Sequence, residues 1–294
     1  IMKLRKIMAV LMAASVAASL AGCGGSSSSG SSDSSSDSAS SDSGKVYKIG
    51  ICQQLEHEAL DQATQGFEDA CEEKFGKDNV TFDLQNGQGE QANCATITNS
   101  FVADNVDLIL ANATTALQCA AAATDSIPIL GTSITDYATA LDISDWNGST
   151  GMNISGTSDL APIDQQEDML VELVPDVKTV GILYCSAEPN SAYQAKLFED
   201  ALKEDGIEYK EYTAADSNEI QSVTTSAISE CDALYIPTDN TMASNTEIIN
   251  NICLPAKVPV VAGEQGICAG CGIATLSISY YDLGVATGKM AQSW

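Results

Sequence analysis

Arginine and histidine are nearly absent from these 294 residues, because each occurs only once, as Arg5 and His57. After residue 5, no bidentate guanidinium group can therefore hold a bound carboxylate or phosphate. We expect any bound anion to be held by lysine, by hydroxyl groups or by the N-terminus of a helix. With one histidine and no second cysteine pair in metal-ligand spacing, neither a metal nor a cofactor is expected.

Positive charge is also scarce. Thirteen Lys and Arg residues stand against 40 Asp and Glu residues, which gives a formal net charge of −27. Three of these cations, at positions 3, 5 and 6, precede Cys23, so the rest of the chain is more acidic still. Such a charge excludes nucleic acid as a partner, because phosphates need a cationic surface. The only two tryptophans, Trp146 and Trp294, also disfavour sugar, whose sites use aromatic platforms.

Near the start of the chain, the apolar run "AVLMAASVAASL" at 9–20 is too short to span a bilayer comfortably. It follows a basic start and precedes "AGC", the pattern of a secretory signal peptide, here 1–22. "LAGC" resembles a bacterial lipobox and predicts lipidation of Cys23, although an ordinary signal beside a cysteine has the same residues. Residues 24–44 have no large apolar side chain, which predicts a disordered Ser/Gly linker.

Nine cysteines remain after Cys23, and an odd number cannot all pair within one chain. Their spacing indicates no disulfide framework, so we expect free thiols in the core. "CAGC" is the exception, a CxxC motif formed by Cys268 and Cys271. It leaves two interpretations open, a pair of structural thiols or a reactive or metal-binding pair.

The second half of the sequence repeats the first. Ile49 precedes a "FEDA" segment at Phe67, and Val180 precedes another "FEDA" at Phe198. "IPI" begins at 127 and "VPV" at 258, so all three features recur 131 positions later. Apolar side chains at helical spacing predict helices at 59–76 and 191–206. The face of the second helix is predicted from its apolar spacing to carry Tyr193, Leu197, Phe198, Ala201 and Leu202.

Each half alternates short apolar runs with helical or loop segments. The predicted strands lie at 46–52, 79–85, 107–111, 127–131 and 151–156, and then at 178–184, 208–213, 232–237, 258–262 and 272–279. Such alternation predicts an α/β fold with two Rossmann-like lobes, each with a parallel sheet, joined by a hinge. We expect the N-terminal lobe to comprise 45–157 plus 280–294, and the C-terminal lobe 158–279.

Two polar turns follow corresponding strands, "NATT" at 112–115 and "TDNT" at 238–241. Ligands of open α/β sheets bind beyond the carboxyl ends of strands, so we expect these turns to face each other across a cleft. A ligand carboxylate is expected at Thr114 and Thr115 or at Asn190 and Ser191, and an ammonium group at Asp136, Glu188, Asp239 or Glu264. Helix capping alone would explain the same residue types.

The segments "KIGICQQLEHEALDQATQGFEDA", "SGTSDL", "AEPNS" and "YIPTDNTMAS" resemble the substrate-binding lipoproteins of ABC importers, in the branch of tryptophan and tyrosine binders. The resemblance covers nearly all of 46–291. It implies the type I periplasmic-binding-protein fold and a solute-binding protein rather than an enzyme. By motif, it implies that the ligand is bound by Gln53, Gln54, Asn86, Thr114, Thr115, Thr135, Asp136, Asp159, Asn190, Ser191, Asp239, Asn240 and Glu264.

The resemblance also implies the setting. The protein is expected to be a monomer outside the cytoplasm, anchored to the bacterial membrane by lipid. It is expected to deliver an amino-acid-like solute, aromatic or apolar, to a permease and ATPase. Two other functions stay open: a thiol enzyme that uses Cys268 and Cys271, and a ligand-sensing lobe for a receptor.

Some residues fit both a ligand contact and a plain scaffold role, among them His57 and the tyrosines 184, 193, 280 and 281. The sequence departs from the family pattern in two places. Glu58 stands where "EHPALD" would have proline, and "GKMAQSW" ends where relatives continue for a few dozen residues. We therefore expect either a fragment, with one hinge strand missing, or an atypical ending.

Overall fold

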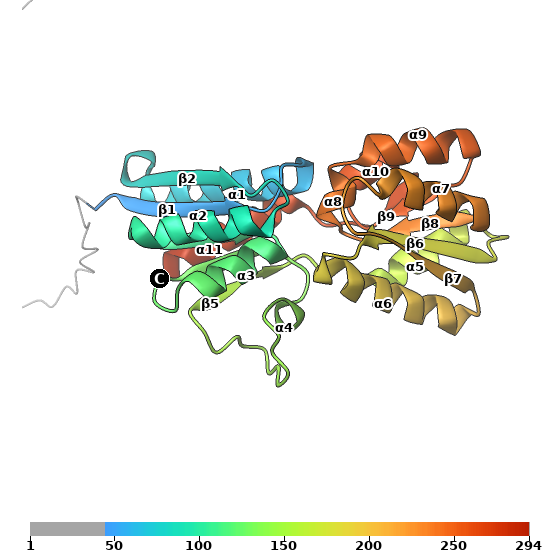
Figure 1. Ribbon diagram of the computed structural model, residues 1–294. Coiled ribbons are helices and arrows are strands. Elements are labelled where there is room, and N and C mark those ends of the chain that lie inside the picture. The colour runs from blue at the N-terminus through green and yellow to red at the C-terminus, as the bar shows by residue number, and fades with distance from the viewer. Residues whose placement is uncertain (1–44, 294) are drawn as a thin grey trace, which may run out of the picture. The chain divides into compact units, whose positions relative to one another are not determined.

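The computed structural model describes residues 45–293. The predicted signal peptide 1–22, Cys23 with its predicted lipid, and the linker 24–44 lie outside the described residues. The described part forms two sheets of five parallel strands, each flanked by helices (Figure 1). We call the unit around the first sheet the N-lobe and the unit around the second the C-lobe.

The N-lobe alternates strands with helices as the sequence predicted. Its elements are β1 (Tyr47–Gln53), α1 (Glu58–Phe75), the 3-10 helix η1 (Lys77–Asn79), β2 (Val80–Asn86), α2 (Gln91–Ala103), β3 (Leu108–Asn112), α3 (Thr114–Ala123), β4 (Ile129–Ile134), α4 (Tyr137–Ala140) and β5 (Ile154–Ser158). After the C-lobe, the chain returns to this lobe with α11 (Tyr280–Met290) and η2 (Ala291–Ser293).

The C-lobe follows the same plan. Its elements are α5 (Ile163–Leu173), β6 (Thr179–Cys185), α6 (Pro189–Asp205), β7 (Glu208–Ala214), α7 (Ile220–Glu230), β8 (Ala233–Ile236), α8 (Asn240–Ala243), α9 (Thr246–Ala256), β9 (Val260–Ala262), α10 (Gln265–Cys271) and β10 (Ala274–Thr275). Among the described residues, none of the helices is both long and apolar enough to cross a membrane.

The two sheets have the same topology. The strand order is β2-β1-β3-β4-β5 in the N-lobe and β7-β6-β8-β9-β10 in the C-lobe, and every strand pair is parallel. In both lobes, the order reverses beside the first strand, where doubly wound folds bind ligands. This matched order is the structural counterpart of the repeat in the sequence.

Each sheet is buried on both faces, which explains its nearly continuous apolar strands. In the N-lobe, one face packs on α2 and α3 through residues such as Phe101 and Leu117, and the other packs on α1 through Phe67. In the C-lobe, Tyr235 on β8 stacks on Phe198 of α6, with 3.6 Å between ring centroids. All nine cysteines of the described chain are free thiols, as predicted, and seven of them are buried.

Helices α1 and α11 cross with their backbones in contact. A Cβ atom at Gly284 would lie 2.0 Å from the carbonyl oxygen of Ala63, and one at Gly66 would lie 2.1 Å from that of Tyr281. Gly284→Ala is therefore expected to lower the free energy of unfolding by about 1–3 kcal/mol, because the helices must move apart. Urea denaturation measures this change, and a loss below about 0.5 kcal/mol would contradict so close an approach.

Two details of the fold were predicted wrongly. The strand predicted at 272–279 is only Ala274–Thr275, and the following crossing to α11 lies outside regular strands. On α6, Leu197 is 37% exposed, although its spacing placed it on the buried face. Gln194 is buried there instead, because its amide bonds Thr238 of the C-lobe and Thr135 of the N-lobe.

Candidate ligand-binding site

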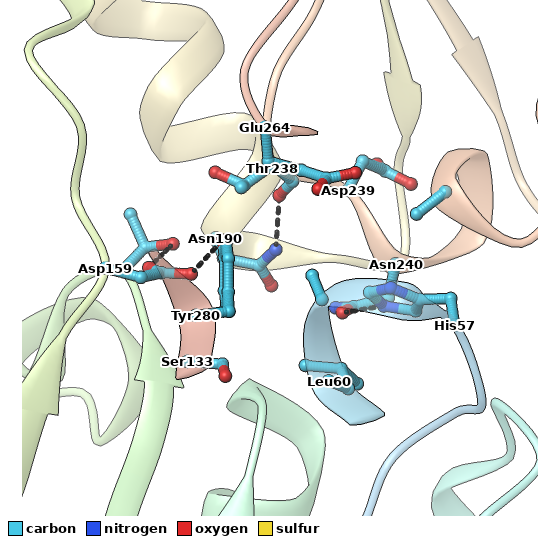
Figure 2. Close-up of a pocket in the computed structure, with 13 residues that line it drawn as sticks. His57, Leu60, Ser133, Asp159, Asn190, Thr238, Asp239, Asn240, Glu264 and Tyr280 are labelled. Carbon is cyan, nitrogen blue, oxygen red and sulfur yellow. Dashed lines mark hydrogen bonds between the residues drawn. The ribbon is translucent and has the colours of Figure 1, made fainter. Parts of the chain in front are cut away.

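A pocket lies between the lobes, at the carboxyl ends of their strands; we call it the central pocket (Figure 2). From the N-lobe and the crossings between the lobes, it is lined by His57, Ala59, Leu60, Ser133, Thr135, Asp159 and Tyr280. From the C-lobe it is lined by Asn190, Thr238, Asp239, Asn240, Ala243 and Glu264. The atom-free space is about 290 Å³ and includes solvent at the mouth of the pocket, and only about 10 Å³ has room for the centre of a water molecule.

Three carboxyl groups face this pocket, and among the described residues no lysine or arginine lines it. Burial raises the pKa of Asp159 and of Glu264. Burial and the negative charge of Glu188 together raise the pKa of Asp239 to about 8. Buried negative charge without a cation is costly, so this pocket favours a guest that brings positive charge.

The three carboxyl groups each accept two hydrogen bonds from the protein, but from different kinds of donor. Asp239 accepts hydrogen bonds from the backbone N–H of Cys185 and Met242, and Glu264 accepts from those of Gly266 and Ile267. Among the described residues, Asp159 accepts from two hydroxyl groups, the Thr135 Oγ1 at 3.0 Å and the Tyr280 Oη at 2.8 Å. Asp159 is therefore the one of the three that is bonded by rotatable side-chain hydroxyls and not by backbone N–H groups, and it retains further acceptor capacity.

Two buried polar atoms in the pocket wall have no hydrogen-bond partner among the described residues, Ser133 Oγ and Asn190 Oδ1. Buried polar atoms are normally paired, and an amide oxygen can only accept. Ser133 also has a φ of 57°, an uncommon backbone conformation for a residue with a side chain. Unpaired buried polar atoms can form hydrogen bonds with a ligand, and uncommon backbone conformations are often found at binding sites.

The lobes also touch each other directly beside the pocket. The His57 ring Nε2 on the N-lobe lies 3.0 Å from Asn240 Oδ1 on the C-lobe (Figure 2). Gln194 of α6 donates to Thr135 Oγ1 at 3.3 Å across the same boundary. These contacts close the pocket, so a guest as large as an amino acid needs the lobes to separate before it enters.

The structure brings six of the thirteen predicted site residues into the central pocket: Thr135, Asp159, Asn190, Asp239, Asn240 and Glu264. Ser191 is fully buried behind it. Gln53 and Asn86 line a separate surface pocket at the ends of β1 and β2. Asp136 caps α4 by accepting the N–H of Thr139 at 2.7 Å and does not line the central pocket.

The first polar turn, at 112–115, does not line the central pocket. Thr115 and Gln54 instead line a second cavity, together with Thr241 of the other turn. Gln54 Oε1 accepts the Thr115 N–H at 2.9 Å, so a ligand carboxylate at the start of α3 would have to displace this bond. Thr114 is buried. The β4 end and the start of α1 contribute to the pocket in place of this turn.

At the second turn, protein carboxylates already fill the N-terminus of α8. Glu188 accepts the N–H of Asn240 at 3.1 Å and that of Thr241 at 2.8 Å. Asp239 accepts the N–H of Met242 at 2.8 Å. Glu188 was expected as an ammonium partner, but it instead holds this turn in place.

Sequence reasoning missed Ala59, Leu60, Ser133 and Ala243 as lining residues. Small or apolar side chains are the commonest core residues, so nothing in their type distinguishes a pocket wall. The positive φ of Ser133 is a property of the folded backbone and has no signature in "GTSITD".

A profile described as "ABC transporter substrate binding protein" matches residues 48–293. The chain belongs to this family. Its members are substrate-binding proteins rather than enzymes, and the two lobes have the predicted type I periplasmic-binding-protein fold. A tyrosine-binding protein of Clostridioides difficile (strain R20291) is 36% identical over 253 residues, 85% of this chain and 73% of that protein.

Similar solved structures include substrate-binding proteins of the same kind. The ABC domain in complex with L-Trp from Streptococcus pneumoniae is 34% identical, with a TM-score of 0.81 over 85% of this chain and 84% of that one. The ligand-free, open structure of a substrate-binding protein with adhesive properties from Clostridium difficile is 36% identical, with a TM-score of 0.60 over 84% of each chain. A leucine-binding protein from Thermotoga maritima is 17% identical, with a TM-score of 0.55 over 78% of this chain and 67% of that one, and it shares the fold.

Proposed function

We propose that this substrate-binding protein captures an aromatic amino acid in the central pocket and delivers it to an ABC importer. It acts outside the cytoplasm as a monomer, anchored through a lipid on Cys23. The observation that carries the proposal is a closed pocket with three carboxyl groups, two unpaired polar atoms and no lysine or arginine among its described lining residues.

The ammonium group is the part of an amino acid that this pocket suits best. Asp159 and the unpaired Asn190 Oδ1 both accept hydrogen bonds, and an ammonium group donates three. The positive charge would also offset the cost of burying Asp159, Asp239 and Glu264. This role for Asp159 replaces the expected roles of Asp136 and Glu188, which cap helices.

The ligand carboxylate requires hydrogen-bond donors, and two side chains of the pocket can supply them. The Ser133 hydroxyl is unpaired, and His57 has a second ring nitrogen besides the one beside Asn240. The apolar walls at Leu60 and Ala243 are suited to an aromatic side chain. Thr135 and Asn240 complete the proposed contacts.

A hinge motion supplies the room that the closed pocket lacks. At nearly equal identity, the TM-score is higher with the L-Trp complex than with the open structure, which supports a closed arrangement of the lobes here. The names of the relatives, a tyrosine-binding protein and an L-Trp complex, support an aromatic ligand.

The alternative thiol enzyme has little support. Burial raises the pKa of Cys268, and it raises that of Cys271 to about 12. A reactive cysteine needs the opposite shift, because the thiolate is the nucleophile.

L-Tyr or L-Trp is expected to stabilise the purified protein by roughly 2.7 kcal/mol at a concentration 100 times its Kd. For a protein of this size, that corresponds to a rise in Tm of about 5–10 °C. Thermal unfolding and calorimetry measure the effect, with glucose as the control ligand. Absence of a shift with every amino acid would contradict the ligand class.

Two analogues separate the roles of the charged groups. Tryptamine keeps the ammonium group of tryptophan and lacks its carboxylate, whereas indole-3-propionate keeps the carboxylate and lacks the ammonium. The acceptor-rich pocket predicts that tryptamine retains more affinity. Tighter binding of indole-3-propionate would contradict the assigned orientation.

A further inference from the structure

A buried carboxyl group in the C-lobe has one oxygen atom without a hydrogen-bond partner among the described residues. Glu167 on α5 is 2% exposed, and its Oε1 has no hydrogen-bond partner among the described residues. The preceding residue shows the usual pattern: Gln166 donates to the carbonyls of Gly263 and Leu276 and accepts the hydroxyl of Tyr235. A buried carboxylate without compensation is costly, so Glu167 calls for an explanation.

Two further carboxyl groups lie beside it. Asp168 follows on α5, and Asp205 is the last residue of α6; one ligand oxygen from each of the three residues lies within 4.8 Å of the others. Asp168 and Asp205 are exposed to solvent. The C-terminus of α6 adds a partial negative charge at this point.

The described chain supplies no cation to this group. Lys203, two residues before the end of α6, pairs with Glu199 and Asp200. The negative charge of three adjacent carboxyl groups is therefore not balanced by an ion pair among the described residues. An external cation would relieve it.

We propose that Glu167, Asp168 and Asp205 bind a divalent cation, with Ca²⁺ preferred. Ca²⁺ takes six to eight oxygen ligands at 2.3–2.6 Å, so oxygens on opposite sides of the ion are about 4.8 Å apart. Carboxylate oxygens are hard ligands, and the cluster contains no histidine or cysteine that would favour zinc. The two exposed members leave room for water to complete the coordination.

This site is separate from the central pocket. Asn190, which lines that pocket, and Asp205 lie near opposite ends of α6, about 22 Å apart at 1.5 Å per residue. The cation would join α5 to the end of α6 and so stabilise the C-lobe without touching the ligand. The proposal therefore does not depend on which solute the protein binds.

The test uses the purified protein after treatment with a chelator, at pH 8. Added CaCl₂ is expected to raise its Tm, and calorimetry should give one site per chain. Glu167→Gln should lower the apparent affinity for Ca²⁺ at least about tenfold. Glu172→Gln removes the same charge from an exposed position on the same helix and should bind as the wild type does.

Without Ca²⁺, Glu167→Gln should be at least as stable as the wild type, because it removes a buried charge; Asp205→Asn at the surface provides a second variant. Equal Ca²⁺ shifts in the wild type and in both variants, or no shift with 10 mM Ca²⁺, would overturn the site. A larger shift with Mg²⁺ than with Ca²⁺ at equal concentration would overturn the preference for Ca²⁺.

Discussion

Glu188→Ala is expected to lower the free energy of unfolding by about 3–5 kcal/mol, the largest loss of stability predicted for this protein. Glu188 Oε1 accepts the N–H and the hydroxyl of Thr241, at 2.8 and 2.7 Å. Its Oε2 accepts the N–H and the amide group of Asn240, at 3.1 and 2.7 Å, and the amide group of Asn190. Alanine would leave the donors of Asn240 and Thr241 without this acceptor, whereas the Asn190 amide would keep Ser191 and the Thr238 carbonyl.

Urea denaturation of matched variants measures this effect. Glu204→Ala removes an equal charge from an exposed position on α6 and is expected to change stability by less than about 0.5 kcal/mol. Glu188→Gln keeps one acceptor oxygen and should fall between the two. If Glu188→Ala were as stable as Glu204→Ala, the carboxylate would not be what holds the second turn.

The same contacts explain why residue types at a helix start could not locate the ligand. Ser, Thr, Asp and Asn at 238–241 are equally suited to capping and to binding, and the sequence does not tell which donors are already occupied. In the structure, Glu188 and Asp239 occupy the N-terminus of α8. The turn therefore forms part of the pocket wall. Its N–H groups are already bonded to these carboxylates, so they do not form an anion-binding site.

The sequence predicted the fold more completely than it predicted the binding site. Ten strands were predicted, and residues 45–293 form ten, because strands buried on both faces give clear apolar runs and because the repeat at 131 residues marks the same strands twice. The strand predicted at 272–279 was too long, because "GIATLSIS" keeps its apolar alternation beyond the point where the pairing of β10 with β9 ends. On α6, the polar Gln194 displaced Leu197 from the buried face because it meets the other lobe.

Site residues were predicted where a polar group is itself the signal, as with Asp159, Asn190 and Glu264. They were missed where the backbone path decides, as with Ser133 at a φ of 57°. Gln53 shows the reverse error: its amide group follows β1 as expected, but it bonds Leu55, Asp61 and Thr64 within the N-lobe. Which acceptors remain unpaired is a property of the whole fold, and a single strand end does not reveal it.

Asp159→Asn should separate binding from stability. Affinity for L-Tyr or L-Trp is expected to fall by roughly 30-fold to several thousand-fold, because loss of one member of a buried charge pair costs about 2–5 kcal/mol. The free protein should stay folded, since the asparagine amide can still pair with the hydroxyls of Thr135 and Tyr280. Burial raises the pKa of Asp159, so the neutral amide also removes a desolvation cost.

Calorimetry with the amino acid and with tryptamine tests this assignment. Both ligands carry the ammonium group, so Asp159→Asn should weaken both by a similar factor. Asp136→Asn is the matched control, because Asp136 caps α4 outside the central pocket, and its affinity should equal that of the wild type. Unchanged affinity in Asp159→Asn, or an equal loss in Asp136→Asn, would remove Asp159 from the ammonium site and leave Asp239 or Glu264 to hold the charge.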